Sequence, residues 1–443
     1  REARGSGRAP PDALVPLGRM QRQKVRISRS RMLESALKVL ELYGTAKSTL
    51  EVEYFDEVGT GLGPTLEFYS TVSRCLQERS LGMWREARAA EPATSGPEYV
   101  DAPHGLFPRP ITPADTGVNT DKLEPTSAGT SILQLFKFAG HFVAKGLIDS
   151  RVLDLPLHEE FWAAVQRYVS AARHDSCEFA WSWGQLEAVD QDMANSLHYL
   201  YQFVKAKDDI YARKDMSMEQ MQLAAEAIRD PKSQAAISDL ALDFTLPGHP
   251  EIELRAGGAD IPVTISNVHN YVDLVARWIL DVGIRAQVEA FCAGFDKVFP
   301  CGDLLIFTPA ELCRIVGPSA ESEDWSSATL RSAIKAEHGF SLASPTVQMF
   351  LGFMESLDCL GRRSFLRFVT GAPRLPLGGF RALYPPLTLV QKMSEAPLSP
   401  DDYLPSVMTC ANFIKLPNYS SLEVLKSRWG HAVAEGQQSF HLS

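Results

Sequence analysis

The residue best suited to covalent chemistry in this sequence is a cysteine between two Leu-Pro pairs. The stretch YLPSVMTCANFIKLPNYSS, residues 403–421, places Cys410 between Pro405 and Pro417. Because proline lacks a backbone donor and restricts the residue before it, the segment favours a loop leading into a short strand at 411–416. A thiolate is a strong nucleophile, and thioester exchange requires only a fraction of the thiol to be ionised. No histidine stands beside Cys410, so the local sequence shows no Cys-His dyad, and a lone cysteine is most often structural.

A second stretch, EYFDEVGTGLGPTLEFYS at 53–70, has the strand, glycine turn and helix order of many nucleotide-binding proteins. The dinucleotide fingerprint fails, because Pro64 or Leu66 occupies the position of its last glycine, and the turn has no lysine for a P-loop. Asp56 and Glu57 at its entry would repel a phosphate. The pattern therefore favours a tight structural turn over a nucleotide-dependent enzyme.

Composition narrows the class of protein. The chain has 443 residues, 45% hydrophobic and 22% charged, with a formal net charge of −10. This length suits two or three domains, and the negative charge disfavours non-specific nucleic-acid binding by the body. No apolar run approaches the ~18 residues needed to span a membrane, so no membrane partner is expected. Residues 1–25 mix arginine with Gly, Pro and Ser and predict a disordered basic linker. Without an initial Met or a signal-peptide pattern, the chain is interpreted as a fragment of a longer protein.

The cysteines indicate a reducing compartment. All seven are scattered and none forms a Cys-x-x-Cys pair, which disfavours a disulfide framework or a structural zinc site. A cytoplasmic or nuclear location is therefore expected, with no metal.

Hydrophobic periodicity predicts an α+β fold with helices dominating the first part. Helical stripes occur at 131–148, 157–172, 190–229, 268–282, 285–298, 345–358, 361–369 and 420–435. Alternation predicts strands at 48–58 and 387–390, and short strands within 239–265 joined by a glycine hairpin turn at 257–258. In the helix at 131–148, Gly140 and Gly146 would let neighbouring elements approach closely. Residues 317–339 are predicted to hold an interdomain hinge.

Several motifs in one order resemble the catalytic domain of HECT-type ubiquitin ligases. They are DEVGTGLGPTLEFY, FKFAGHFVAKGLIDSRVLDLPL, LDFTLPG, GGADIPVTISNVHNYVDLV, FCAGFDKVFP, FLRFVTGAPRLPLGGF and LPSVMTCANFIKLPNYSS. The resemblance runs from about residue 26 to the last residue. The glycine turn and the ending GQQSFHLS are similar to the ubiquitin-fusion-degradation branch.

The resemblance implies a bilobal fold and a thioester mechanism. A mostly helical N-lobe at 26–330 would carry a small conjugating-enzyme-binding subdomain at about 236–300. The hinge within 317–339 would lead to a smaller α/β C-lobe at 331–443. Ubiquitin would pass from a conjugating enzyme to Cys410 as a thioester, and a lysine of a substrate or of ubiquitin would then attack it. Substrates would be bound by regions outside this chain, and no cofactor is implied.

The resemblance also suggests residues that support transfer. Thr409 precedes the nucleophile, and Phe440 stands at the place from the end where the family requires a phenylalanine for transfer to lysine. Many relatives have His-Thr-Cys where this chain has Met408 before Thr409, so the base for lysine attack is open. His441, Asp401, Asp402 and the terminal carboxylate are the candidates.

Two binding surfaces are carried over in the same way. The groove for the conjugating enzyme would include Leu240, Leu242, Tyr271 and Val275. A ubiquitin exosite on the N-lobe would include Tyr69, Leu81 and Trp84. Burial in a core is the alternative for both sets, because aliphatic and aromatic side chains are most often interior.

Two function classes remain from the sequence. The first is a ubiquitin-protein ligase domain that uses Cys410. The second is a non-catalytic interaction module of the ubiquitin system that kept the fold. Formation of a thioester on Cys410 separates them.

Overall fold

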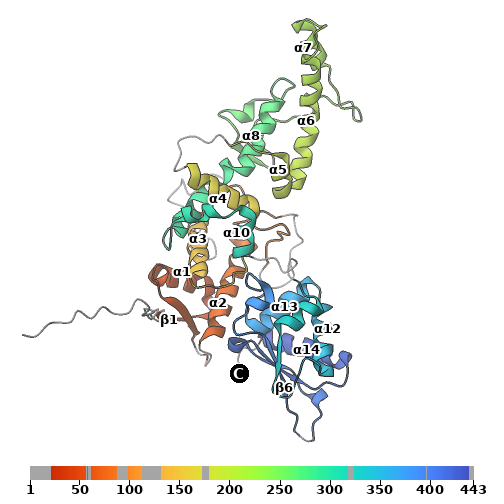
Figure 1. Cartoon of the computed structure of the whole chain (residues 1–443). Coiled ribbons are helices and arrows are strands. Elements are labelled where there is room, and N and C mark those ends of the chain that lie inside the picture. Colours follow the sequence, from red (N-terminus) through yellow and green to blue (C-terminus); the bar gives the residue numbers. More distant parts are fainter. Residues whose placement is uncertain are drawn as a thin grey trace, which may run out of the picture.

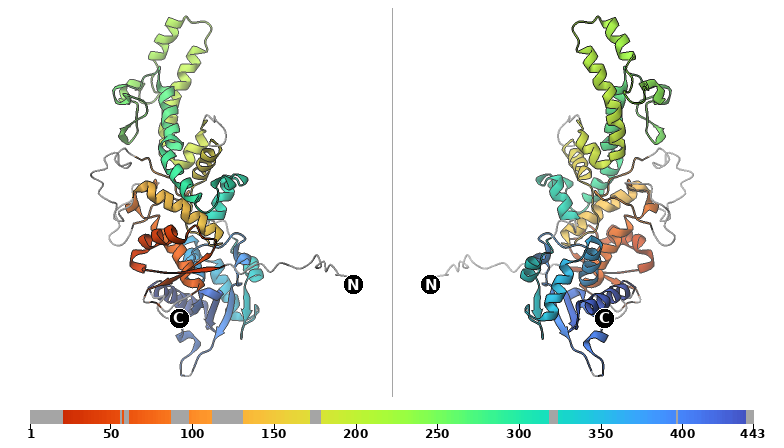
Figure 2. Two further views of the ribbon diagram at one scale, coloured as in Figure 1. Left: turned by 90° about the vertical axis from the view of Figure 1, so that its left-hand side faces the viewer. Right: turned by 90° about the vertical axis from the view of Figure 1, so that its right-hand side faces the viewer.

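Three separate hydrophobic cores divide the described part of the chain (Figure 1). The computed structural model describes residues 21–55, 57, 61–86, 98–111, 131–171, 179–317, 324–395 and 397–438. The first core joins residues 25–165 to 284–316 and defines the large subdomain. The core at 186–280 defines the small subdomain, and the core at 325–429 defines the C-terminal lobe. The small subdomain and the C-terminal lobe lie at opposite ends of the large subdomain (Figures 1 and 2).

The large subdomain opens with a two-stranded parallel sheet that corrects one sequence prediction. Strand β1 (Arg22–Ile27) pairs with β2 (Thr49–Tyr54), so the predicted linker at 1–25 includes four residues of a strand. Val25 and Ile27 are buried while Lys24 and Arg26 face outward. Both outward side chains pair with Glu53, at 3.3 and 3.2 Å. The basic residues therefore serve a cross-strand charge pairing. Residues 1–20 lie outside the described residues.

Two core helices of the large subdomain cross at paired glycines. Helix α3 (Ile132–Ile148) packs on α9 (Arg285–Phe295). A Cβ added to Gly140 would lie 1.9 Å from the carbonyl oxygen of Phe291, and one added to Gly294 would lie 1.8 Å from that of Lys137. Only hydrogen at both positions allows this backbone contact, as predicted for Gly140.

The remaining elements of the large subdomain surround this crossing. They are η1 (Arg29–Arg31), α1 (Met32–Tyr43), α2 (Leu62–Cys75), η2 (Arg79–Leu81), α4 (Glu159–Ala171), η5 (Val282–Ile284), η6 (Cys301–Ile306) and α10 (Pro309–Val316). The helices predicted at 131–148, 157–172 and 285–298 are confirmed as α3, α4 and α9.

The small subdomain has fewer and shorter strands than its alternating pattern predicts. It comprises α5 (Trp183–Val189), α6 (Gln191–Tyr211), α7 (Met218–Glu226), η3 (Ile237–Leu240), β3 (Thr245–Leu246), β4 (His249–Glu253), η4 (Gly258–Asp260) and α8 (Val268–Leu280). Helices α6 and α7 project from its far end (Figure 1).

The hairpin turn lies elsewhere than predicted. Strands β3 and β4 are joined at Pro247-Gly248, and 257–258 begins a short helical turn. Gly258 is needed because an added Cβ would lie 2.4 Å from the carbonyl oxygen of Phe244. The extent of the subdomain also differs from about 236–300. Its core starts at Leu186, while residues 284–295 belong to the large subdomain.

The C-terminal lobe packs helices on a four-stranded sheet of order β5-β6-β8-β7. Its elements are α11 (Ser327–Ala333), β5 (Lys335–Glu337), α12 (Pro345–Glu355), α13 (Cys359–Thr370), η7 (Gly379–Ala382), β6 (Thr388–Lys392), η8 (Pro400–Asp402), β7 (Ser406–Met408), η9 (Thr409–Ala411), β8 (Phe413–Pro417) and α14 (Leu422–Gln438). The predicted hinge at 317–339 thus includes a helix and a strand of this lobe, α11 and β5, while its residues 318–323 lie outside the described residues. Trp325 and Leu330 lie in its core, so the lobe starts before residue 331.

Candidate active site

Cys410 lies in a tight turn between two antiparallel strands. Strand β7 ends at Met408, η9 covers Thr409–Ala411, and β8 begins at Phe413. Asn412 closes the turn with a positive φ of 52°. Its side-chain nitrogen donates to the carbonyl oxygen of Pro385 at 2.7 Å, and its own carbonyl accepts from the backbone nitrogen of Thr388 at 3.0 Å. The predicted junction before a strand is confirmed, and β7 was missed because three residues between Pro405 and the turn give too little pattern.

The glycine turn of the large subdomain supports this cysteine turn. Gly61 caps α2 with a φ of 88°, a conformation that favours glycine. A Cβ added to Gly63 would lie 3.0 Å from Oγ1 of Thr409. The first turn of α2 therefore borders η9. The N-terminus of a helix such as α2 stabilises negative charge that lies near it. This contact with Thr409 agrees with a structural role for the turn. Residues 58–60 lie outside the described residues.

The acidic candidates for a general base are engaged in local turns. Asp402 accepts hydrogen bonds from the backbone nitrogen and the hydroxyl of Ser399, both at 2.8 Å. These bonds lower the pKa of Asp402, which makes its carboxylate a weaker base. Asp401 accepts from the backbone nitrogen of Ser420 at 2.9 Å. His441, Phe440 and the terminal carboxylate lie outside the described residues.

The three residues proposed for a ubiquitin exosite are core residues. Tyr69, Leu81 and Trp84 are each at most 3% exposed. The hydroxyl of Tyr69 donates to Oδ2 of Asp149 at 2.8 Å, and the indole nitrogen of Trp84 donates to the carbonyl oxygen of Leu76 at 2.7 Å. Because their surfaces and polar atoms are engaged inside the large subdomain, this structure corrects the exosite prediction in favour of its alternative.

The four residues predicted for the conjugating-enzyme groove fall into two groups, one buried and one partly exposed. Tyr271 and Val275 on α8 are 2% and 0% exposed, so the structure places them in the core of the small subdomain. The ring of Tyr271 packs edge-on against Phe244, with centroids 5.6 Å apart. Leu240 and Leu242 are half-buried and keep part of their surface accessible, although Leu240 ends η3 and neither lies in a strand. Of the four residues, only these two could contact a partner without rearrangement.

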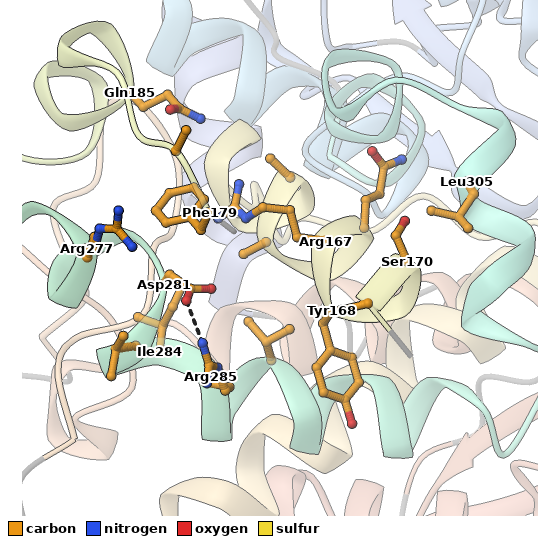
Figure 3. Close-up of a pocket in the computed structure, with 17 residues that line it drawn as sticks. Arg167, Tyr168, Ser170, Phe179, Gln185, Arg277, Asp281, Ile284, Arg285 and Leu305 are labelled. Atoms are coloured by element: carbon orange, nitrogen blue, oxygen red, sulfur yellow. Dashed lines mark hydrogen bonds and ion pairs between the residues drawn. The ribbon is translucent and has the colours of Figure 1, made fainter. Parts of the chain in front are cut away.

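A large cavity marks the joint between the two subdomains (Figure 3). Its volume is about 1070 Å³, and α4 lines it opposite the junction of α8 and α9. The Arg167 guanidinium stacks over Phe179 at 4.3 Å and donates to the carbonyl oxygen of Leu280 at 3.0 Å. Burial lowers the pKa of Arg167. Asp281 is paired with Arg285 at 2.6 Å on the facing wall, as Figure 3 shows. The cavity thus lies between two packed units that Arg167 also joins, and it was not predicted from sequence.

The described residues offer no ready site for a metal ion. Among them, no group of three or more His, Cys, Asp or Glu side chains is arranged to hold one. No helix in the described part of the chain is both long and apolar enough to cross a membrane.

Comparison with known proteins places the chain in a family. A sequence model described as HECT-domain (ubiquitin-transferase) matches residues 73–443. E3 ubiquitin-protein ligase TRIP12 of Danio rerio is 40% identical over 430 residues, which cover 96% of this chain and 20% of that protein. Ubiquitin fusion degradation protein 4 of Saccharomyces cerevisiae is 38% identical over 442 residues, covering 98% of this chain and 27% of that protein.

A plant relative agrees with both. E3 ubiquitin-protein ligase UPL3 of Arabidopsis thaliana is 40% identical over 452 residues, covering 96% of this chain and 22% of that protein. The chain therefore spans only about a fifth to a quarter of the length of these curated relatives. The predicted resemblance is confirmed, and these relatives support the ubiquitin-fusion-degradation branch. The chain belongs to the HECT-domain (ubiquitin-transferase) family.

Proposed function

We propose that this chain is a ubiquitin-protein ligase domain that carries ubiquitin on Cys410. The observation that supports this most directly is the position of Cys410, in a turn at the boundary between the C-terminal lobe and the glycine turn of the large subdomain. The matched family region, 73–443, includes this cysteine. The partners in this proposal are a ubiquitin-conjugating enzyme, ubiquitin and protein substrates. The proposed compartment is the cytoplasm or nucleus, where thiols stay reduced.

The proposed chemistry is two successive acyl transfers. The Cys410 thiolate attacks the carbonyl carbon of the ubiquitin thioester on the conjugating enzyme, and that enzyme's cysteine leaves as a thiolate. A neutral lysine amine then attacks the new thioester, the Cys410 thiolate leaves, and the amine loses a proton as the isopeptide bond forms. The first exchange is nearly balanced in energy, so correct positioning of the two sulfur atoms is the main requirement.

Replacing Cys410 tests the proposal directly. The chain is incubated with activating enzyme, conjugating enzyme, ATP and ubiquitin, and the products are separated on a non-reducing gel. We expect a ubiquitin adduct that thiol reductant removes. Cys410→Ala should abolish it, and Cys410→Ser should give an adduct that resists reductant, because an oxygen ester replaces the thioester.

Cys359 is the matched control for this experiment. It is an exposed thiol in the same lobe, at the start of α13. Cys359→Ala should retain the adduct. If no adduct forms with any of a panel of conjugating enzymes, or if loss follows Cys359, the catalytic proposal is wrong. The first of these results would favour the alternative of a non-catalytic interaction module.

Phe440→Ala is expected to separate the two transfers. In the proposed mechanism Phe440 supports only the attack of lysine, so the variant should form the Cys410 thioester at close to the normal rate. Its isopeptide formation should fall by about tenfold or more, the scale of a lost positioning contact. Single-turnover loading and pulse–chase discharge onto free lysine measure the two steps separately. An equal loss in both steps would contradict this role.

Docking of the conjugating enzyme is proposed for the small subdomain. The half-buried Leu240 and Leu242 support this surface, and Leu242 also lines a hollow of about 420 Å³ with Pro262. Tyr271 and Val275 would act beneath the surface by fixing α8.

A further inference from the structure

A buried carboxylate joins the two lobes. Asp154 belongs to the large subdomain and is 2% exposed. Its oxygens accept from Nη2 of Arg363 at 2.8 and 3.0 Å and from Nε of Arg374 at 2.6 Å. Both arginines belong to the C-terminal lobe, Arg363 in α13 and Arg374 after it. The hydrophobic cores of the two lobes are separate, and these charged hydrogen bonds cross from one lobe to the other.

Asp154 offsets a concentration of positive charge at this interface. Arg367 lies one turn after Arg363 on α13. Its pKa is lowered mainly by burial, and the nearby positive charge of Arg74 in the large subdomain also lowers it. Burial also lowers the pKa of Arg374, and repulsion from the charge of Arg363 acts in the same direction. Without the carboxylate, the three arginines of the C-terminal lobe would lose the negative charge that offsets them, and Arg367 would still lie near Arg74 of the large subdomain. Removing one partner of a buried ion pair is costly because the remaining charge stays desolvated.

The same interface holds the cysteine turn. Helix α13 contacts η9, and Gly371 at its end lies over the start of α2, where an added Cβ would be 3.4 Å from the Cβ of Leu66. Thr409 meets Gly63 on the same helix. The ion pairs and the turn therefore belong to one contact surface. This surface lies at the end of the large subdomain away from the small subdomain (Figures 1 and 2).

We propose that Asp154 is a positioning residue for ubiquitin transfer, a latch that Arg363 and Arg374 close. This inference rests on the proposed function of Cys410. Closed, the latch holds the turn at 409–411 against α2, remote from a conjugating enzyme docked on the small subdomain. Loading of Cys410 requires the latch to open. Reclosing returns the loaded cysteine to the large subdomain for attack by lysine. The C-terminal lobe thus has two positions, a loading pose with the latch open and a transfer pose with the latch closed.

Hydrogen exchange tests the latch without any activity. Asp154→Asn keeps the shape of the side chain and removes its charge. Arg363→Gln is a milder second variant, because this side chain is 32% exposed and Arg374 keeps its partner. Both should speed amide exchange in 62–75 and 359–374 while exchange in α12, inside the lobe, stays unchanged. Arg285→Gln, which breaks the ion pair of the exposed Arg285 with Asp281, is the matched control and should leave all these segments unchanged.

Rates of the two transfers then test the role in the reaction. For Asp154→Asn we expect loading of Cys410 to rise by about threefold and discharge to lysine to fall by about tenfold, a population shift towards the open pose. Arg363→Gln should change both rates in the same directions by less. Equal slowing of both steps, or unchanged exchange at 62–75 in both variants, would overturn the latch. Failure of the unmodified chain to load ubiquitin would instead refute the proposed function, and the exchange data would still report on the lobes.

Discussion

Replacing Gly294 by alanine is expected to destabilise the large subdomain by about 3 kcal/mol or more, the upper range for overpacking a core. The new Cβ would lie 1.8 Å from the carbonyl oxygen of Lys137, which is backbone and cannot rotate away. Helices α3 and α9 would have to separate along the contact that holds the subdomain together. Urea unfolding followed by circular dichroism measures the loss.

The reciprocal variant and a matched glycine sharpen this experiment. Gly140→Ala should cost a similar amount, because its Cβ would lie 1.9 Å from the carbonyl oxygen of Phe291. Gly352 lies inside α12, and among the described residues no atom beyond its own helix backbone and chain neighbours lies within 4 Å of an added Cβ. Gly352→Ala should therefore stabilise its helix by about 0.5–1 kcal/mol. Equal effects at Gly294 and Gly352 would show that the helices do not cross in this way.

Asp149→Ala is expected to cost about 3–5 kcal/mol, the usual penalty for stranding a buried charge. Its carboxylate pairs with Lys145 at 2.9 Å, and both side chains are fully buried. Oδ2 of Asp149 also accepts from the backbone nitrogen of Leu50 at 3.2 Å and the hydroxyl of Tyr69 at 2.8 Å. The variant would leave the buried ammonium group of Lys145 without its counter-ion and two donors without their acceptor. The free energy of unfolding in urea is the measurement.

Two comparisons isolate the charge. The double variant Lys145→Met with Asp149→Asn removes both charges and keeps an acceptor oxygen, so it should recover more than half of the loss. Arg285→Ala breaks another i, i+4 pair, in which the arginine is 61% exposed, and should cost less than about 1 kcal/mol. A double variant as unstable as Asp149→Ala would mean that packing, and not stranded charge, sets the cost.

The sequence predicted the structure best where the residues of a single element are enough to determine its conformation. The apolar stripe at 131–148 predicts α3, and the paired prolines predict the break around Cys410. Local pattern was insufficient where two signals compete. The basic residues before Val25 indicated a linker, although alternation with Ile27 also fits a strand, and the acidic partner strand decided the outcome. In the small subdomain, the alternation at 240–244 begins in the helical turn η3, and Phe244 packs its backbone on Gly258 without joining a strand.

The burial of the proposed binding residues could not be predicted from the sequence. Family resemblance transfers a position along the chain, but exposure depends on neighbours distant in sequence. Trp84 lies between Phe136 and Phe161, and Tyr271 lies against Phe244, so both are interior. The contact of Asp154 with Arg363 joins residues 209 apart, and no periodicity or motif predicts which acid meets which arginine across two lobes.

The separation of the three cores has a consequence for inherited variation. Each core can lose its packing while the others persist, because each is built from its own set of buried residues. Ile414 and Leu416 are both fully buried in β8, within the core of the C-terminal lobe. A polar substitution at either position would damage the lobe that carries Cys410 and leave the small subdomain folded.

Under the proposed function, such a molecule would still bind its conjugating enzyme but could not accept ubiquitin from it. It would compete with intact copies for the same partner. One damaged allele could therefore impair the product of the healthy one.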